Sequence, residues 1–316
     1  MMQIIWIILG ILVLVILLVG LGGALFFFDY AVRRKPAKPD RPVDKKSPWA
    51  YLRPLMDQGK KWIGEQKPER VEIQSFDGLT LTGFLLEQKK EPESHRVMVM
   101  MHGFRSHDFN DFALSVRYFY DAGYHVLLCD QRAHGGSQGK YLTFGVKERY
   151  DCRDWAKFGA ERWGENTRVF LMGVSMGAAT VLMSLGLDLP KAVKGVVADC
   201  GYTSPKAIFA HVLKHSYHLP CFPILNVANM LCKWRAGFGL SEYSTLDALE
   251  KNKIPVFFLH GGKDDFVPKT MTEQNYEKCT ARKELLIIDE AAHAMSFLCK
   301  PEKCFREINR FLDGCE

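Results

Sequence analysis

The sequence lacks the cysteine patterns of zinc-binding and disulfide-stapled proteins. Nine cysteines, an odd number, are scattered over 316 residues with no Cys-x-x-Cys pair and no Cys/His zinc spacing. Most are expected to be buried free thiols, as the apolar strands around Cys129 and Cys200 suggest. Cys299 and Cys304 are close enough in the chain for a disulfide, but free thiols are the preferred interpretation there too.

The chain also lacks a broad basic surface pattern. Its net charge is +6 at pH 7, yet the clearest basic cluster is one short stretch, residues 33–46, beside an apolar segment. A nucleic-acid-binding domain needs its basic residues gathered on one folded face. No nucleic-acid partner is therefore expected.

Charge is absent from the amino-terminal segment Ile4–Phe28, which is about 25 residues long and could cross a bilayer with some tilt. A cleaved signal peptide would have a basic residue before the apolar stretch and a small-residue cleavage site after it. This segment has neither. Residues 1–30 are therefore predicted to be a retained transmembrane anchor, and the basic, proline-rich residues 31–47 a tether.

The side of the membrane follows from the flanking charges. Positive residues occur only after the apolar segment, so the positive-inside rule predicts a single-pass protein whose folded part faces the cytoplasm. The opposite orientation stays open, because amino-terminal anchors often export the domain that follows.

Residues 48–316 have the pattern of one α/β domain. Two strands joined by a turn at Asp77-Gly78 are followed by alternating strands and helices, which predicts a mostly parallel central sheet covered by helices on both faces. Strands are expected at 70–76, 79–86, 96–103, 124–130, 168–172, 193–201, 254–262 and 284–289. Helices are expected at 48–66, 109–122, 146–163, 176–187, 269–280 and 296–313.

One segment, about residues 202–253, is too long for an ordinary connection between two strands. It is predicted to be a helical cap over the carboxyl edge of the sheet. His211, His215 and His218 within it would share a helical face and could hold zinc. Because no carboxylate nearby completes such a site, exposed cap histidines are preferred and no metal is expected.

The motif Gly173-x-Ser175-x-Gly177 lies between the strand at 168–172 and the helix at 176–187. A strand that reverses sharply into a helix leaves little room for side chains, which suits glycines on both sides of a displayed serine. The alternative is a plain small-residue turn. The strand and helix around the motif favour a nucleophilic serine.

A nucleophilic serine needs a base and an acid. His293 follows the last predicted strand, where a loop could bring its ring to Ser175. Asp264 and Asp265 stand side by side after the strand at 254–262, and Asp199 ends the preceding strand. The spacing alone does not choose among these three carboxylates.

With these residues the chain resembles the α/β-hydrolase superfamily, in particular its bacterial membrane-attached members of the alkaline esterase or acylpeptidase-like kind. The resemblance covers about residues 68–314. It rests on His102-Gly103, Asp130-x-Arg132-x-His134-Gly135-x-Ser137, Gly173-x-Ser175-x-Gly177, His260-Gly-x-x-Asp264-x-x-Val-Pro268 and His293.

The resemblance implies a catalytic triad of Ser175, His293 and Asp264. It also implies an oxyanion hole made by the backbone N–H groups of Phe104 and Met176, and it implies no cofactor. One departure is Ala133, where the family usually has glycine. The Asp130 and Arg132 charges are expected to form a structural ion pair rather than a substrate clamp.

The expected function is a membrane-anchored serine hydrolase that cleaves carboxylic esters or thioesters of apolar acyl groups, carried by a small molecule or a lipid. The alternatives are a serine peptidase or acylaminoacyl-peptidase-like hydrolase and a catalytically silent hydrolase-like binding module. The sequence does not predict an oligomeric state.

Overall fold

The computed structural model describes residues 2–36, 50, 52–106, 108–164 and 166–315, apart from the side chains at positions 12, 13, 16 and 17. Over these residues, eight strands form one sheet in the order β1-β2-β4-β3-β5-β6-β7-β8. β2 is antiparallel to both of its neighbours, and all other pairs are parallel. The strands are β1 (Glu69–Gln74), β2 (Thr80–Leu86), β3 (Arg96–Met101), β4 (His125–Cys129), β5 (Arg168–Val174), β6 (Val193–Asp199), β7 (Val256–Gly261) and β8 (Lys283–Ile288).

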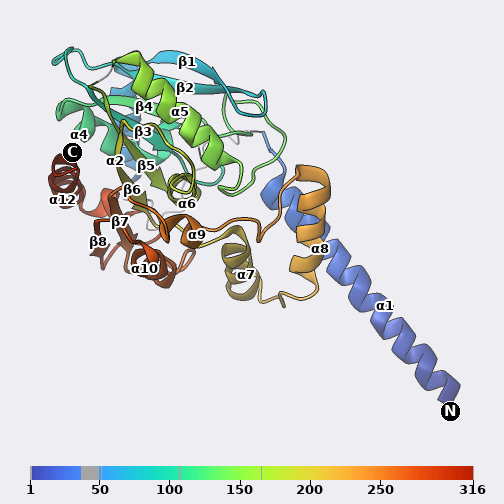
Figure 1. The fold of residues 1–316 in the computed structure, drawn as a ribbon. Helices are drawn as coiled ribbons and strands as arrows, with labels where there is room; N and C mark the ends of the chain where they lie inside the picture. Colours follow the sequence, from blue (N-terminus) through green and yellow to red (C-terminus); the bar gives the residue numbers. More distant parts are fainter. Residues whose placement is uncertain (1, 37–49, 51, 107, 165, 316) are drawn as a thin grey trace.

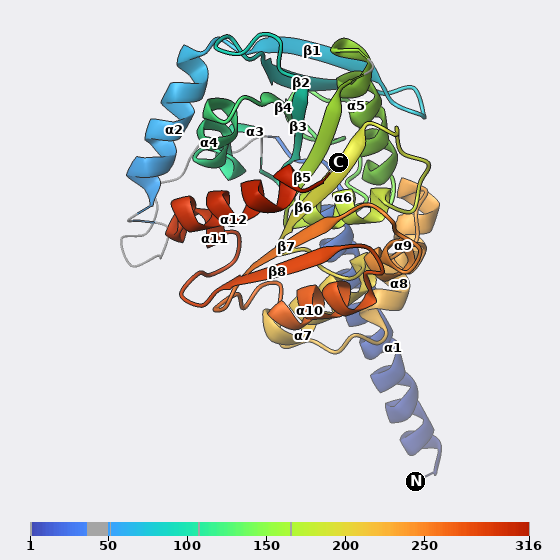
Figure 2. The ribbon, with the colours of Figure 1, turned by 60° about the vertical axis from the view of Figure 1, so that its left-hand side comes forward.

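Helices cover both faces of this sheet (Figures 1 and 2). One face carries α2 (Arg53–Glu65), α3 (Asp108–Asp111), α4 (Ser115–Asp121), α11 (Ser296–Cys299) and α12 (Pro301–Asp313). The other carries α5 (Glu148–Arg162), α6 (Met176–Ser184) and α10 (Lys269–Lys278). Because both faces are covered, the central strands are continuously apolar rather than alternating: every residue of β4 and of β7 is buried. The predicted fold class is confirmed.

Two helices predicted as single elements are divided. The predicted helix 296–313 becomes α11 and α12, separated at Lys300. Pro301 disfavours the helical conformation of the residue before it, and Lys300 has φ −138° and ψ 62°. The predicted helix 109–122 becomes α3 and α4.

The insertion between β6 and β7 is helical, as expected. It contains α7 (Pro205–His215), α8 (Ile224–Leu231), the π-helix η2 (Cys232–Ala236) and α9 (Thr245–Leu249). α7 starts at Ser204, whose hydroxyl accepts the N–H of Ala207, and Pro205 fits the first helical position. The helix ends at His215, so His218 does not continue its face.

The amino-terminal helix α1 (Met2–Phe27), extended by the π-helix η1 (Phe28–Val32), projects from the body and runs beside α8 (Figure 1). A stripe of mostly small and aromatic residues on the second half of α1 and on η1 is buried, partly against the cap and partly against residues 141–142. A Cβ at Gly20 would come within 2.8 Å of the Pro223 ring, so glycine permits the close approach there. The buried stripe consists of Gly20, Ala24, Phe27, Phe28, Ala31 and Val32.

The chain after η1 continues along the domain surface. Arg33 forms an antiparallel bridge with Tyr141, and the Arg34 guanidinium donates to the carbonyl oxygens of Gly135 and Ser137 at 2.8 and 2.6 Å. Residues 37–47 of the predicted tether lie outside the described residues. The predicted domain boundaries stay a prediction.

Among the residues described, no helix is found that is both long and apolar enough to cross a membrane. The transmembrane anchor is therefore unsupported here and stays a prediction. All nine cysteines lie in the described part of the chain, and no disulfide joins any of them.

Candidate active site

Ser175 stands at the turn between β5 and α6. Its backbone has φ +55° and ψ −112°, a conformation that is costly for a residue with a side chain. The two flanking glycines leave the space for this turn: a Cβ at Gly173 would collide with the Gly177 backbone, and one at Gly177 with the Met101 carbonyl oxygen. The motif is therefore the predicted strand-to-helix elbow and not a plain small-residue turn.

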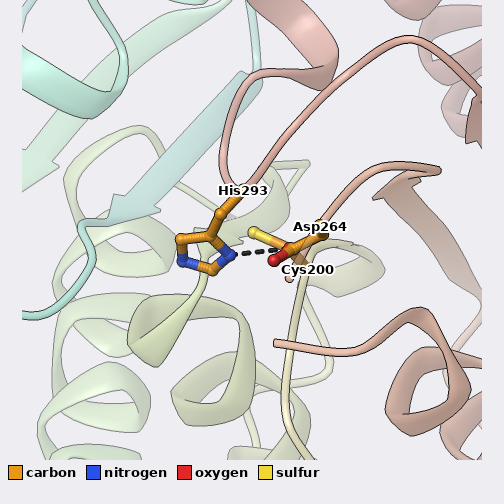
Figure 3. Close-up of side chains that lie close together, drawn as sticks. All are labelled: Cys200, Asp264 and His293. Atoms are coloured by element: carbon orange, nitrogen blue, oxygen red, sulfur yellow. Dashed lines mark hydrogen bonds and ion pairs between the residues drawn. The ribbon is translucent and has the colours of Figure 1, made fainter. Parts of the chain in front are cut away.

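The structure brings the three residues predicted as a triad together. His293 lies in the loop after β8, and its Nε2 is 2.9 Å from the Ser175 Oγ. Its Nδ1 is 2.7 Å from the Asp264 Oδ2, the contact drawn in Figure 3. A hydroxyl, an imidazole and a carboxylate thus form one hydrogen-bonded chain across three separate loops.

Asp264 is held as a buried anion. Its Oδ1 accepts the backbone N–H groups of Phe266 and Val267 at 3.0 and 2.9 Å, while Oδ2 is 3.2 Å from His260 Nε2. Burial by itself would raise the pKa of Asp264. The hydrogen bonds from His260, His293 and the backbone outweigh burial and lower that pKa to about 2. The carboxylate is therefore charged at any pH where a histidine can act as a base.

The other two candidate carboxylates do not contact His293. Asp265 is exposed on the same loop. Asp199 is buried at the end of β6, where its Oδ1 accepts the Ser296 hydroxyl at 3.3 Å. Burial raises the pKa of Asp199 to about 7. Its carbonyl oxygen accepts the N–H of Ser175 at 2.8 Å, so Asp199 supports the turn through its backbone.

Two backbone donors lie beside Ser175. Met176 is the first residue of α6, so its N–H has no partner within the helix, and Phe104 lies in the loop after β3. Neither N–H donates to another group in the described part of the chain. Both residues line the same cavity as Ser175. This is the arrangement that can stabilise an oxyanion.

Two histidines to which the sequence analysis gave no role hold the loop that carries Phe104. His102 Nε2 accepts the N–H of Gln131, and His134 Nε2 accepts the N–H of Arg105, each at 3.1 Å. Burial lowers the pKa of His134 well below its ordinary value, which keeps the ring neutral and able to accept. The His-Gly motifs were a signal for these residues, but spacing alone could not assign their partners.

The predicted ion pair between Asp130 and Arg132 is wrong, because Arg132 pairs with other carboxylates. Arg132 Nε and Nη2 donate to Asp151 at 2.6 and 2.7 Å, and the two Nη atoms reach Asp77 at 2.9 and 3.1 Å. The Asp130 Oδ2 instead accepts the N–H of Gly136 at 2.7 Å. The role is nevertheless structural, because Arg132 ties the β1–β2 turn to α5.

Ala133 has φ +61°, which explains why glycine suits this position. A left-handed backbone costs a residue with a Cβ roughly 1–2 kcal/mol, and glycine avoids that cost. The N–H of Ala133 donates to Gln138 at 2.9 Å, so the loop keeps its closure despite the strain.

A cavity of about 510 Å³ opens beside Ser175. Its lining combines cap and loop residues with three residues from the amino-terminal segment, which the sequence analysis treated as separate from the site. A larger hollow of about 710 Å³ lies between α2 and α4, away from Ser175, and contains none of the predicted site residues. The cavity at Ser175 is lined by Phe27, Tyr30, Ala31, Phe104, Phe144, Ser175, Met176, Tyr202, Ile208, Phe209, Val212, Ser216, Tyr217 and Phe266.

Metal ligation has one geometric candidate in the described residues. Ligand atoms of Cys200, Asp264 and His293 lie within 4.8 Å of one another (Figure 3). Two of them already share a hydrogen bond, and burial raises the pKa of the Cys200 thiol well above its ordinary value. A protonated thiol is a poor ligand, so the cluster is better suited to orienting His293. The other predicted candidates, His211 and His215, lie on the cap with their rings stacked, and the ring centroids are 4.3 Å apart.

Comparison with known proteins agrees with this fold. A family model described as serine aminopeptidase, S33, matches residues 92–237, a range that includes Ser175 but ends before Asp264 and His293. The uncharacterized protein YqkD of Bacillus subtilis is 29% identical over 242 residues, which cover 77% of this chain and 78% of that protein.

Two further similarities concern proteins with named activities. The thiohydrolase apmlB of Arthrinium phaeospermum is 34% identical over 141 residues, 42% of each chain. The structure of the Pyrococcus furiosus esterase Pf2001 superposes with a TM-score of 0.64 at 25% identity, covering 87% of this chain and 98% of that one. With its α/β-hydrolase fold and its serine elbow, the chain is a serine hydrolase that is similar to the S33 serine aminopeptidase family over residues 92–237.

Proposed function

We propose that the protein hydrolyses carboxylic esters or thioesters through an acyl-enzyme. Ser175 attacks the acyl carbonyl, His293 takes the serine proton and returns it to the leaving group, and Asp264 orients the imidazole and stabilises its charged form. The N–H groups of Phe104 and Met176 stabilise the oxyanion, and water then releases the acid by the reverse proton transfers. The carrying observation is the hydrogen-bonded chain from Ser175 through His293 to Asp264.

The lining of the cavity supports an apolar acyl group. None of its fourteen residues is charged; the polar groups are the hydroxyls of Ser175, Ser216 and three tyrosines. An aminopeptidase must bind the ammonium group of its substrate, and an ammonium buried without a carboxylate is strongly disfavoured. The esterase and thiohydrolase names among the similar proteins point the same way.

Peptide hydrolysis is the second candidate, favoured by the serine aminopeptidase description of the matching family model. A panel of nitrophenyl esters and aminoacyl nitroanilides, given to the full-length protein, separates the two. We expect kcat/KM to be at least about 100-fold higher for an ester of an uncharged acyl chain, since an unpaired buried ammonium costs several kcal/mol. Equal or faster cleavage of the anilides would favour the peptidase.

We further propose that α1 anchors the enzyme in the cell membrane, with the catalytic domain in the cytoplasm. Support comes from the uncharged segment Ile4–Phe28 and from the basic residues that follow it. The substrate is then a small-molecule or lipid ester available at that membrane.

The orientation is tested with a membrane-impermeant maleimide on intact cells that carry Ser47→Cys. Labelling above that of the parent chain, which has nine cysteines of its own, should appear only after lysis. Extra labelling before lysis would put the domain outside.

A further inference from the structure

The cap exposes large apolar side chains beside the amino-terminal helix. Phe222 and Trp234 are each 75% exposed, and Met230 is 60% exposed. All three lie on α8, η2 or the loop before α8, the part of the cap that runs along α1 (Figure 1). We call these three residues the cap patch. Three large apolar side chains exposed on one short stretch of a folded domain suggest an interaction surface.

The position of the cap patch relative to α1 is fixed by direct packing. Pro223, which follows Phe222, lies against Gly20, and the Ile224 side chain lies against Gly23. Before Gly20 the helix leaves the domain, because the described side chains from Met2 to Val19 are all exposed. Phe222 therefore lies where α1 parts from the protein body, while Trp234 lies on η2, which contacts η1 nearer the domain.

The charge of this region fits the surface of a bilayer. The projecting residues 2–19 of α1 extend about 27 Å at 1.5 Å per residue. Lys233 and Arg235 flank Trp234 in the sequence, and both are exposed. An exposed tryptophan between two basic residues is typical of the boundary between acyl chains and headgroups.

The acyl cavity has a wall made of the same helix. The Phe27 ring packs edge-on against Tyr217 of the cap at 4.9 Å, and both line the cavity together with Tyr30. The Arg105 guanidinium lies 4.6 Å from the Tyr30 ring centroid, which connects this wall to the loop that carries Phe104. The wall of the acyl cavity is thus continuous with the helix that leaves the domain beside Phe222.

We propose that the cap patch docks on the lipid bilayer around α1, so that membrane-borne esters pass along α1 and the cap into the cavity at Ser175. The inference rests on the proposed function and its anchor, and it narrows the substrate class to amphiphiles resident in the membrane. A bilayer is the occupant favoured over a second copy or a protein partner, because the apolar helix and the basic rim adjoin the patch directly.

Docking is tested without catalysis by quenching tryptophan fluorescence with brominated lipid tails, using full-length protein in vesicles. Trp234→Phe should reduce the quenched fraction. The matched change Trp62→Phe, on the half-buried face of α2, removes an unquenched tryptophan and should not reduce that fraction. Equal quenching in the Trp234→Phe variant and the parent protein would overturn the docking.

The route is tested with two esters, soluble nitrophenyl acetate and a long-chain ester dissolved in the vesicles. Loss of one large apolar contact with lipid is about a tenfold effect. The double variant Phe222→Ser/Trp234→Ser should therefore lose about tenfold or more on the vesicle-borne ester and less than about twofold on the soluble one. Leu55→Ser, an exposed apolar residue on α2, serves as the control and should change neither rate.

The outcomes separate the route from the function. Equal loss on both esters, or no loss on either, would overturn the membrane route alone. A parent protein that cleaves neither ester would overturn the proposed function, and with it the route.

Discussion

Replacing Ser175 by alanine is expected to lower kcat by about 10⁴-fold or more on any ester that the enzyme turns over. The change removes the only oxygen within hydrogen-bond distance of His293 Nε2 among the described residues, so no acyl-enzyme can form. The fold should survive, because the strained backbone at position 175 is held by the flanking glycines and by the Asp199 carbonyl oxygen.

The measurement is steady-state turnover of a nitrophenyl ester with circular dichroism as the check on folding. Ser216→Ala is the matched control: this serine also lines the cavity but has no contact with His293, and its loss should change kcat by no more than a few-fold. Comparable losses in both variants, or residual turnover near the parent rate in Ser175→Ala, would place the nucleophile elsewhere.

Replacing Asp264 by asparagine is expected to lower kcat by about 10⁴-fold, because an amide can donate to the imidazole and favour the wrong tautomer. The pKa of Asp264 is about 2, so the parent carboxylate is charged throughout the range from pH 5 to 9. Because the pKa of the Asp264 carboxyl is lowered, the carboxylate begins to take up protons only below the ordinary carboxyl pKa near 3.8. The Asp264 carboxyl should therefore not titrate in that range, and the loss is measured at pH 8, above the ordinary pKa of histidine.

Asp265→Asn is the matched control, since it makes the same change one residue along, on an exposed side chain. Its effect on kcat should be less than about threefold. A larger loss for Asp265→Asn than for Asp264→Asn would show that the acid has been assigned to the wrong neighbour.

Local patterns predicted the sheet because they record burial. Continuous apolar runs such as 254–262 correspond to strands covered on both faces, and the turn at Asp77-Gly78 to a glycine with φ +80°. The site was predictable for a related reason: a strand-to-helix elbow needs small residues around Ser175, and that need leaves a mark in the sequence.

Contacts between distant segments were not predictable in this way. Arg132 pairs with Asp77 and Asp151, 55 and 19 residues away, and nothing in the spacing ranks these carboxylates above the adjacent Asp130. The docking of Phe27 and Tyr30 into the acyl cavity depends on how the cap packs against α1. An apolar helix has the same pattern whether one of its faces meets lipid or protein.

The most direct measurement is to treat the full-length protein with a fluorophosphonate probe and to locate the adduct by mass spectrometry. A fluorophosphonate reacts with a serine whose hydroxyl is activated by a neighbouring base. We expect a single major adduct on Ser175, absent from Ser175→Ala and much slower to form in Asp264→Asn. An unlabelled protein, or an adduct on any other residue, would contradict the catalytic role of the Ser175–His293–Asp264 chain.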